Sequence, residues 1–342
     1  MRKGLKIIFK AILIITAGII MLICGLIINN RIYYSKYNKV NTNTEILTDN
    51  ELKDIASVYQ YITDFGNDIY NGFDTQTELI IYNREYEFLF TDDEYGDEWK
   101  FIGHDEITEK NIYRRKADTP QAFAIKLYNH WVASFCTHDY YNVSILEQVP
   151  VFMPPQMFLL DDIAYKSIIV HEMVHALQGN RDSYRVDAAE HIHNVCSAYY
   201  GNNDFNNLIK QEGKILKEAI NLTDIAEITS KVHEFIAIRD SRRNTCGMTY
   251  DEISSEKEIE WLEGMARYAE YIASKGSKSI IAKNLDDITQ KVVVSSDDRY
   301  YALGMAEIML IKKLNITDWQ QKLFHEKYTP EDILTQIFST VQ

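Results

Sequence analysis

The sequence predicts an α+β protein that begins with a transmembrane helix and continues through a small mixed or antiparallel sheet into a mostly helical half. Three observations lead to this fold class. An uncharged, almost wholly apolar run fills residues 11–28, segments rich in aromatic and β-branched residues follow between about residues 75 and 153, and helical signals dominate from Asp161 onwards. With 46% hydrophobic residues and only 5 Pro among 342 residues, the chain is not of the disordered class.

Residues 1–31 are expected to form a cytoplasmic tip and a transmembrane signal anchor. They contain five basic residues and no acidic residue, and the apolar run is long enough to span a bilayer. The run ends in Asn29-Asn30 without the small-residue pattern of a cleavage site, which favours an anchor that is not removed. Basic residues in front of the run favour a cytoplasmic N-terminus, so residues 32–342 are expected outside the membrane.

Residues 32–50 include a mostly polar stretch and are expected to form a stalk, and residues 51–160 are expected to form an α/β part. The α/β part opens with apolar residues at helical spacing. It continues with strand-like segments at 78–91 and 122–136, the second of which is broken by a turn. A further apolar run, Val149–Met153, adds another expected strand.

Residues 161–342 carry few strand signals and are expected to be helical. Side chains that can accept hydrogen bonds from a first helical turn recur before apolar periodic segments. The patterns that mark helix starts are Asp161, Ser255 with Glu258 as a capping box, and Thr329 with Pro330 at the first helical position.

The pentapeptide His171-Glu172-Met173-Val174-His175 lies inside the helix that Asp161 is expected to cap. Because residues four apart share a helix face, both imidazoles can bind one metal ion while Glu172 projects beside them towards a metal-bound water. The flanking residues are mostly apolar, as expected for a buried and rigid helix. The pattern also arises by chance, so a metal site requires a third ligand.

Glu263 is the best candidate for the third ligand. The extended metzincin motif requires Gly and His at the positions that Gln178 and Arg181 occupy, which excludes that branch of metallopeptidases. Glu263 has the apolar neighbours Leu262 and Met265, and its carboxylate would complete a His2Glu site with a fourth position free for water. The alternative is that Glu263 is one more acid on a solvated helix face.

The HEMVH pattern and the later WLEGMARYAE segment resemble the gluzincin branch of zinc metallopeptidases, and in particular the catalytic domain of the aminopeptidase N family. The resemblance covers roughly residues 160–325. It implies a zincin-like catalytic half in which one Zn²⁺ per chain is held by His171, His175 and Glu263. It also implies peptide-bond hydrolysis by a zinc-activated water, with Glu172 as the general base.

Two further residues are assigned through the same resemblance. Tyr301 opens a YALGMA segment similar to the family's Y-x-K-G-A motif, whose Tyr assists the oxyanion. Glu270 lies on the same helix as Glu263 and would either orient a ligand imidazole or form a salt bridge. The resemblance also makes Val149–Met153 a candidate edge strand for an extended substrate, with an ordinary core strand as the alternative.

The chain departs from the aminopeptidase pattern in two respects. Glu263 follows His175 by 88 residues, a far longer interval than in that family, so a helical insert at about residues 180–250 is expected between the two ligand helices. The G-x-M-E-N motif, whose Glu binds the free amine of an aminopeptidase substrate, is absent from the sequence. Aminopeptidase specificity is therefore not implied, and an endopeptidase is equally consistent with the residues.

Charge and composition narrow the partners. Without residues 1–31 the chain carries a formal charge of −19, which argues against nucleic acid as a partner. The expected partners are a peptide or protein substrate and the lipid bilayer at residues 11–28. Two alternatives remain open: a catalytically inactive zinc-binding ectodomain that acts as a sensor or partner-binding module, and an anchored helical protein that binds no metal.

Overall fold

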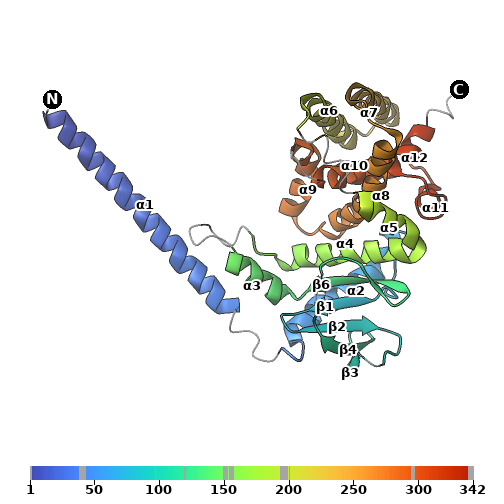
Figure 1. Cartoon of the computed structure of the whole chain (residues 1–342), viewed down its shortest axis with the longest axis horizontal. Helices are drawn as coiled ribbons and strands as arrows, with labels where there is room; N and C mark the ends of the chain where they lie inside the picture. Colours follow the sequence, from blue (N-terminus) through green and yellow to red (C-terminus); the bar gives the residue numbers. More distant parts are fainter. Residues whose placement is uncertain are drawn as a thin grey trace.

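The computed structural model confirms the α+β class, with a long N-terminal helix, a mixed sheet and a mostly helical C-terminal part (Figure 1). The structure describes residues 2–37, 44–96, 98–118, 121–148, 153, 158–192, 199, 201–293 and 297–337. The helices after the first are α2 (Asp49–Ile69), α3 (His138–Gln148), α4 (Asp162–Arg181), α5 (Ser183–Ile192), α6 (Asn203–Asn221), α7 (Ile225–Cys246), α8 (Tyr250–Ala273), α9 (Lys278–Gln290), the 3₁₀ turn η3 (Lys291–Val293), α10 (Asp298–Lys313), α11 (Trp319–His325) and α12 (Pro330–Gln336).

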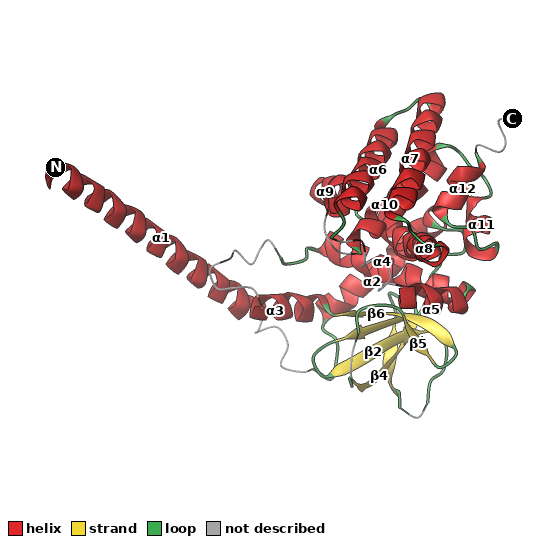
Figure 2. Ribbon diagram, turned by 45° about the horizontal axis from the view of Figure 1, so that its top comes forward, coloured by secondary structure: helices red, strands yellow, loops and turns green. Residues whose placement is uncertain are grey.

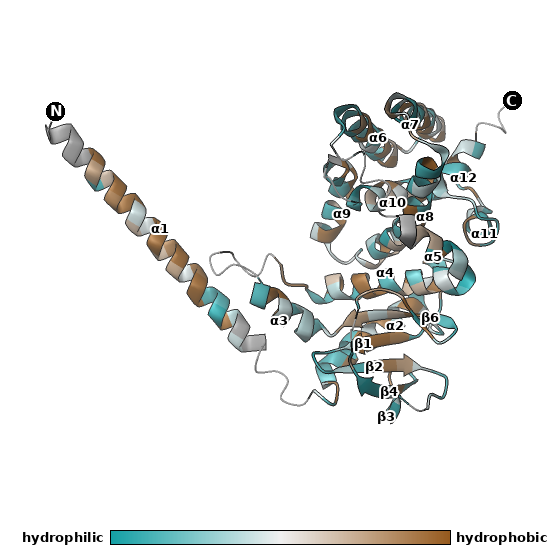
Figure 3. Cartoon of the chain, viewed as in Figure 1, coloured by the Kyte–Doolittle hydropathy of each residue, from teal (hydrophilic) through white to brown (hydrophobic). Residues whose placement is uncertain are grey.

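Helix α1 (Arg2–Tyr37) projects away from the rest of the chain (Figure 1). Its segment Ile8–Tyr33 is long and apolar enough to cross a membrane, and its most apolar window is not buried against other residues. Figure 3 shows that hydrophobic residues run along most of this helix. Exposed apolar surface of this extent fits either a membrane anchor or a signal sequence. The helix extends beyond residue 31, where the anchor was expected to end, into the segment expected to be a stalk.

Six strands form one mixed sheet in the order β3-β4-β2-β1-β6-β5. The strands are β1 (Leu79–Tyr82), β2 (Tyr86–Thr91), β3 (Lys100–Asp105), β4 (Lys110–Lys116), β5 (Ile125–Leu127) and β6 (His130–Cys136). Strands β1 and β6 are parallel, and all other neighbours are antiparallel. The turn expected within 122–136 joins β5 to β6, with Tyr128 in the left-handed region at φ 57°.

Alternation of side chains along the strands covers both faces of the sheet. In β2, Phe88 and Phe90 belong to the main core, whereas Leu89 packs with Trp99 and Tyr113 in a small cluster on the other face. Successive residues of a strand point to opposite faces, so the aromatic and aliphatic run of β2 supplies both clusters. The main core lies between the sheet and the helices.

Helix α4 lies between the sheet and the group of helices that includes α6 to α10 (Figures 1 and 2). A Cβ atom at Gly179 would lie 2.3 Å from the Trp131 ring, so this close approach to β6 requires glycine. Next to it, the Asn180 side chain accepts from the Trp131 amide at 2.7 Å and donates to the Trp131 carbonyl at 2.8 Å. These contacts fix the C-terminal half of α4 on the sheet.

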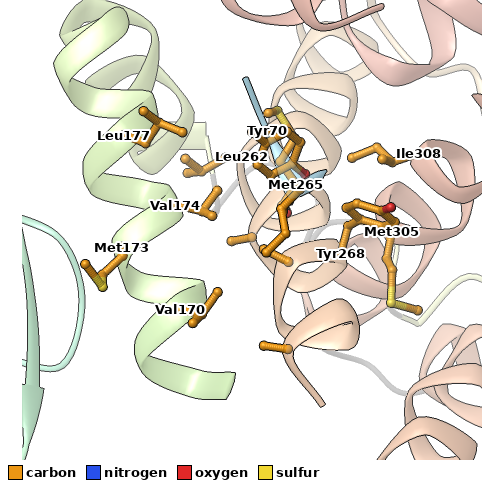
Figure 4. Close-up of a cluster of buried hydrophobic side chains, with 14 of the residues drawn as sticks. Tyr70, Val170, Met173, Val174, Leu177, Leu262, Met265, Tyr268, Met305 and Ile308 are labelled. Atoms are coloured by element: carbon orange, nitrogen blue, oxygen red, sulfur yellow. Dashed lines mark hydrogen bonds between the residues drawn. The ribbon is translucent and has the colours of Figure 1, made fainter. Parts of the chain in front are cut away.

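The opposite face of α4 packs on α8. Figure 4 shows Val170, Val174 and Leu177 of α4 directed towards Leu262 and Met265 of α8. All five side chains are at most 8% exposed. Helix α4 is therefore apolar on two faces, as its sequence predicts, and the two helices that carry the candidate ligands share one core.

Helix α8 begins earlier than its expected capping box. Thr249 and Glu252 form the capping box, in which each side chain binds the backbone N–H of the other residue. The expected pair has other partners, because the Ser255 hydroxyl donates to the Asp251 carbonyl and Glu258 accepts from Arg185. Both pairs match the same sequence signature, and the longer helix satisfies the upstream one.

Helices α8 and α10 cross at two glycines that flank candidate site residues in the sequence. A Cβ atom at Gly264 would lie 2.5 Å from the Cα atom of Gly304, and one at Gly304 would lie 2.3 Å from the Glu260 carbonyl oxygen. This contact between backbones brings Glu263 of α8 near Tyr301 of α10.

Gly264→Ala is expected to lower the free energy of unfolding by about 1–3 kcal/mol, because the added methyl group forces the two helices apart. The measurement is urea-induced unfolding of the metal-free protein followed by circular dichroism. Gly103→Ala is the control, since a Cβ atom at Gly103 would meet no atom within 4 Å. Equal unfolding midpoints for the two variants would contradict the close packing at Gly264.

Helices α5, α6 and α7 occupy most of the interval between α4 and α8, and α6 packs along α7 at the end of the molecule furthest from the sheet (Figure 1).

A buried network of charged side chains joins α7 to its neighbours. The Arg239 guanidinium contacts four carboxylates at 2.7–3.0 Å, those of Glu212, Glu260, Glu307 and Glu331. The buried part of the network comprises Arg239, Arg242 and Arg243 with Glu212, Glu256, Glu260, Glu307 and Glu331, all at most 6% exposed in their side chains.

Candidate metal centre

Helix α4 presents His171, Glu172 and His175 at the core. Its first turn is capped by Asp161, whose side chain accepts from the Ala164 amide at 2.8 Å, as the sequence predicts. Because His171 and His175 are one turn apart, their rings lie side by side with centroids 4.8 Å apart. The three side chains are nearly inaccessible, with residue exposures of 7–9%.

The two imidazoles and the Glu263 carboxylate converge on one point. The Nε2 atoms of His171 and His175 are 3.1 Å apart, and Glu263 Oε2 lies 3.5 Å from the first and 3.3 Å from the second. Tetrahedral zinc with bonds of about 2.0–2.1 Å separates its ligand atoms by about 3.3–3.4 Å. The chain therefore contains a buried His171/His175/Glu263 group that could hold a metal ion.

Gln178 fixes the orientation of His175. Its amide nitrogen donates to the Trp261 and Leu262 carbonyls at 3.1 and 3.2 Å, which leaves its oxygen 3.0 Å from His175 Nδ1. An Nδ1–H donated to that oxygen leaves Nε2 free as a metal ligand. This role of Gln178 is not among the sequence-based predictions, although its position three residues after His175 could have suggested it.

Glu270 contacts the other ligand imidazole. Its Oε2 atom lies 3.4 Å from His171 Nδ1, and its carboxylate also accepts from Arg267 at 2.7 and 2.8 Å. Arg267 in turn contacts Asp287 of α9 at 3.0 Å. A chain of charged side chains therefore runs from α9 through α8 to the candidate ligand on α4.

Without a metal, the arrangement favours a protonated His171 next to an ionised Glu263. Burial lowers the pKa of His171, but the neighbouring carboxylates of Glu263 and Glu270 outweigh burial and raise the pKa to about 10. Burial raises the pKa of Glu263, but the charge of His175 and hydrogen bonds from both imidazoles hold that pKa well below its usual range. A metal ion would take the place of the imidazole proton, so metal binding at this group is linked to proton release.

Glu172 has an unused acceptor atom. Among the described residues, its buried Oε2 atom has no hydrogen-bond partner. Burial is the largest influence on its carboxyl group and raises the pKa to about 7, although His171 and His175 act in the opposite direction. A carboxylate with this pKa and a free acceptor atom can take up a proton at neutral pH.

Tyr301, in the first turn of α10, reaches the same place. Its hydroxyl forms a hydrogen bond with Glu263, and burial together with the charge of Glu263 raises the pKa of Tyr301 well above its usual range. The hydroxyl is therefore protonated at neutral pH and remains a hydrogen-bond donor.

These residues open on a cavity of about 490 Å³. His171, Glu172, His175, Glu263 and Tyr301 form its polar wall. The other lining residues are apolar and come from the β5–β6 region, α5 and α8: Ala122, Phe123, Ala124, Trp131, Val186 and Leu262. Metal-binding groups in a cavity with mostly apolar walls are typical of a small-molecule or peptide site.

The strand beside the cavity is β5. It ends the strand order of the sheet, and residues 122–124, which directly precede it, line the cavity. The strand expected at Val149–Met153 lies outside the described residues, except for Met153, which is in a bend. The edge nearest the candidate ligands is therefore supplied by a segment that the sequence analysis assigned only to a hairpin.

Comparison with protein-family models, curated proteins and solved structures finds no match for this chain. The fold and the candidate site together define an α+β protein with an N-terminal apolar helix and a buried group that could bind a metal.

Proposed function

We propose that this protein is a membrane-anchored zinc peptidase. The observation that carries the proposal is the triangle of His171 Nε2, His175 Nε2 and Glu263 Oε2, with sides of 3.1–3.5 Å, on the wall of a 490 Å³ cavity. Two imidazoles and one carboxylate are the ligand set of catalytic rather than structural zinc sites. The resemblance to gluzincins supports the same assignment.

Each polar residue of the cavity then has a chemical role. When bound, zinc supplies Lewis acidity that polarises a carbonyl and acidifies a coordinated water. Glu172 accepts the proton of the attacking water at its free oxygen and delivers it to the leaving amine. Tyr301 gives up its hydrogen bond with Glu263 and donates instead to the oxyanion that develops on the carbonyl oxygen. Glu270 and Gln178 hold the two imidazoles with Nε2 towards the metal.

The cavity walls support a peptide as the substrate. Trp131, Val186 and Leu262 offer an apolar surface for one side chain, and β5 offers a strand edge to which an extended backbone can pair. In this proposal, helix α1 spans the bilayer with its N-terminus in the cytoplasm, because basic residues precede the apolar segment. The cavity then faces the outside of the membrane and acts on extracytoplasmic peptides or proteins.

Glu263→Ala is expected to reduce zinc from one ion per chain to almost none. The substitution removes one of the three proposed zinc ligands and leaves two imidazoles that cannot complete the site. The measurement is elemental analysis of the full-length protein in detergent after zinc loading and dialysis, together with cleavage of a peptide library. His175→Ala should behave in the same way.

Asp251→Ala is the control, because it removes an exposed carboxylate from the first turn of the same helix. Full zinc content in Glu263→Ala would show that the third ligand is wrong. Absence of zinc from the wild-type protein would overturn the proposal. One zinc per chain without cleavage of any peptide would favour the non-catalytic zinc-binding ectodomain.

A further inference from the structure

We call the cavity of about 490 Å³ that the candidate metal ligands line the metal cavity. A second and smaller pocket adjoins it. Its volume is about 230 Å³, and its walls come from α4, α8, α9, η3 and α10. Sites for whole ligands typically span about 300–1,000 Å³, so this volume suits one side chain or one chain end. We call it the basic pocket and define it by Arg267, Lys283, Asp287, Lys291 and Asp298.

The basic pocket shares two walls with the metal cavity. His171 and Tyr301 line both spaces, and Ala302 continues the wall from Tyr301 into the basic pocket. A substrate that occupies both spaces must bind at the candidate metal ligands and extend past Tyr301 into the basic pocket. The proposed catalytic tyrosine stands between an apolar cavity on one side and charged side chains on the other.

The basic pocket has more cations than anions. Arg267 pairs with Asp287 at 3.0 Å, and Lys291 pairs with Asp298 at 2.7 Å. Arg267 also holds Glu270 at 2.7 and 2.8 Å. Lys283 lines the pocket from an exposed position and has no ion-pair partner within the described part of the chain, so its charge is available to a ligand.

We propose that the basic pocket binds a carboxylate of the substrate, with Lys283 as its cationic partner. The inference rests on the proposed peptidase function and adds a substrate class to it: peptides that carry a carboxylate close to the cleaved bond and an apolar side chain on the other side. The carboxylate comes from an Asp or Glu side chain or from the free C-terminus. Both have the planar, anionic group that an ammonium binds with charge-assisted hydrogen bonds.

The pocket also explains the position of Arg267. Its guanidinium lines the pocket and holds Glu270, which contacts His171. Because Glu270 and Asp287 already occupy Arg267, it serves as a positioning residue, and the substrate carboxylate is left to Lys283. A substrate carboxylate that binds Lys283 therefore leaves the contacts of Arg267 with Glu270 and Asp287 intact.

The test measures both binding and cleavage with the full-length, zinc-loaded protein in detergent. Fluorescent peptides that differ only as Glu or Gln, or as a free C-terminal acid or its amide, are titrated onto the Glu172→Gln variant and are also tested as substrates of the active protein. We expect about tenfold tighter binding of one acidic form, as typical for a charge-assisted hydrogen bond. The pair that shows the difference identifies the source of the carboxylate.

Lys283→Glu should abolish or reverse this preference in both assays. Lys278→Glu makes the same charge change on the same helix, at an exposed position outside the pocket, and should leave the preference unchanged. Cleavage and binding without any preference for the acidic forms would overturn the inference and leave the peptidase intact, as would a preference that survives Lys283→Glu. If no peptide binds or is cleaved, the proposed function itself fails.

Discussion

Glu172→Gln is expected to keep one zinc per chain and to lower peptide hydrolysis by about 10² to 10⁴, the usual contribution of a general acid-base residue. Glu172 lines the cavity next to both candidate histidine ligands, yet its Oε2 atom has no partner among the described residues. The amide of Gln has nearly the same shape but cannot accept a proton. Metal content and kcat/KM on the same preparation separate loss of the base from loss of the metal.

The pH profile provides a second readout of the same residue. Burial raises the pKa of Glu172 to about 7 in the absence of metal, and a bound cation lowers it again. Glu172 must be ionised to accept a proton. The kcat/KM of the active protein should therefore fall as the pH drops below the pKa that Glu172 has with the cation bound.

Glu234→Gln is the matched control for Glu172→Gln. Glu234 follows His233 in the same His-Glu order but is exposed on α7, with half of its side chain accessible. Its replacement should leave hydrolysis unchanged. Wild-type rates in Glu172→Gln would assign the proton transfer to another group.

Arg239→Met is expected to lower the free energy of unfolding by about 3–5 kcal/mol, the range typical of removing one partner from a buried ion pair. Arg239 is fully buried and contacts four carboxylates at 2.7–3.0 Å. Without the guanidinium, those carboxylates remain buried with fewer cations. A thermal melt of the metal-free protein should shift downwards by about 4–8 °C.

The loss should also depend on pH. Burial already raises the pKa of Glu307 to about 7 and that of Glu260 well above its usual range, against the effect of Arg239. Removing Arg239 raises both pKa values further. A carboxyl group with a raised folded-state pKa contributes stability below that pKa and loses it as the pH rises, so the destabilisation should be smaller at pH 5 than at pH 8.

Arg84→Met provides the comparison with an exposed pair. Arg84 and Glu147 are 2.9 Å apart, but their side chains are 59% and 42% exposed. An exposed pair typically contributes less than about 1 kcal/mol. Equal losses in the two variants would show that the buried network is not a major source of stability.

The sequence predicted the candidate metal ligands better than the residues that surround and support them. The spacing of His171 and His175 dictates a common helix face in any helix, and α4 is apolar enough to be recognised as buried. Glu263 was assigned from its apolar neighbours and from the resemblance of its segment to gluzincins. In the structure the three side chains converge, because α4 and α8 share the core of Val174, Leu177 and Leu262.

Other features depend on contacts that sequence patterns do not encode. Gln178 occupies a position considered only for the metzincin motif, and its role follows from the Trp261 and Leu262 carbonyls of α8. The buried arginines of α7 have the composition of a solvated helix face. Their burial follows from acidic residues on four other helices, a match that no local pattern reveals.

The distance along the chain between the candidate ligands affects how the site is made during synthesis. His175 leaves the ribosome 88 residues before Glu263, an interval of about 4–18 s at about 5–20 residues per second. During that time the two imidazoles can hold a metal only weakly, because the third ligand has not yet been translated. If the site holds a metal as proposed, its uptake is therefore postponed until α8 has docked on α4, and a chain truncated before α8 would lack one of the three candidate ligands.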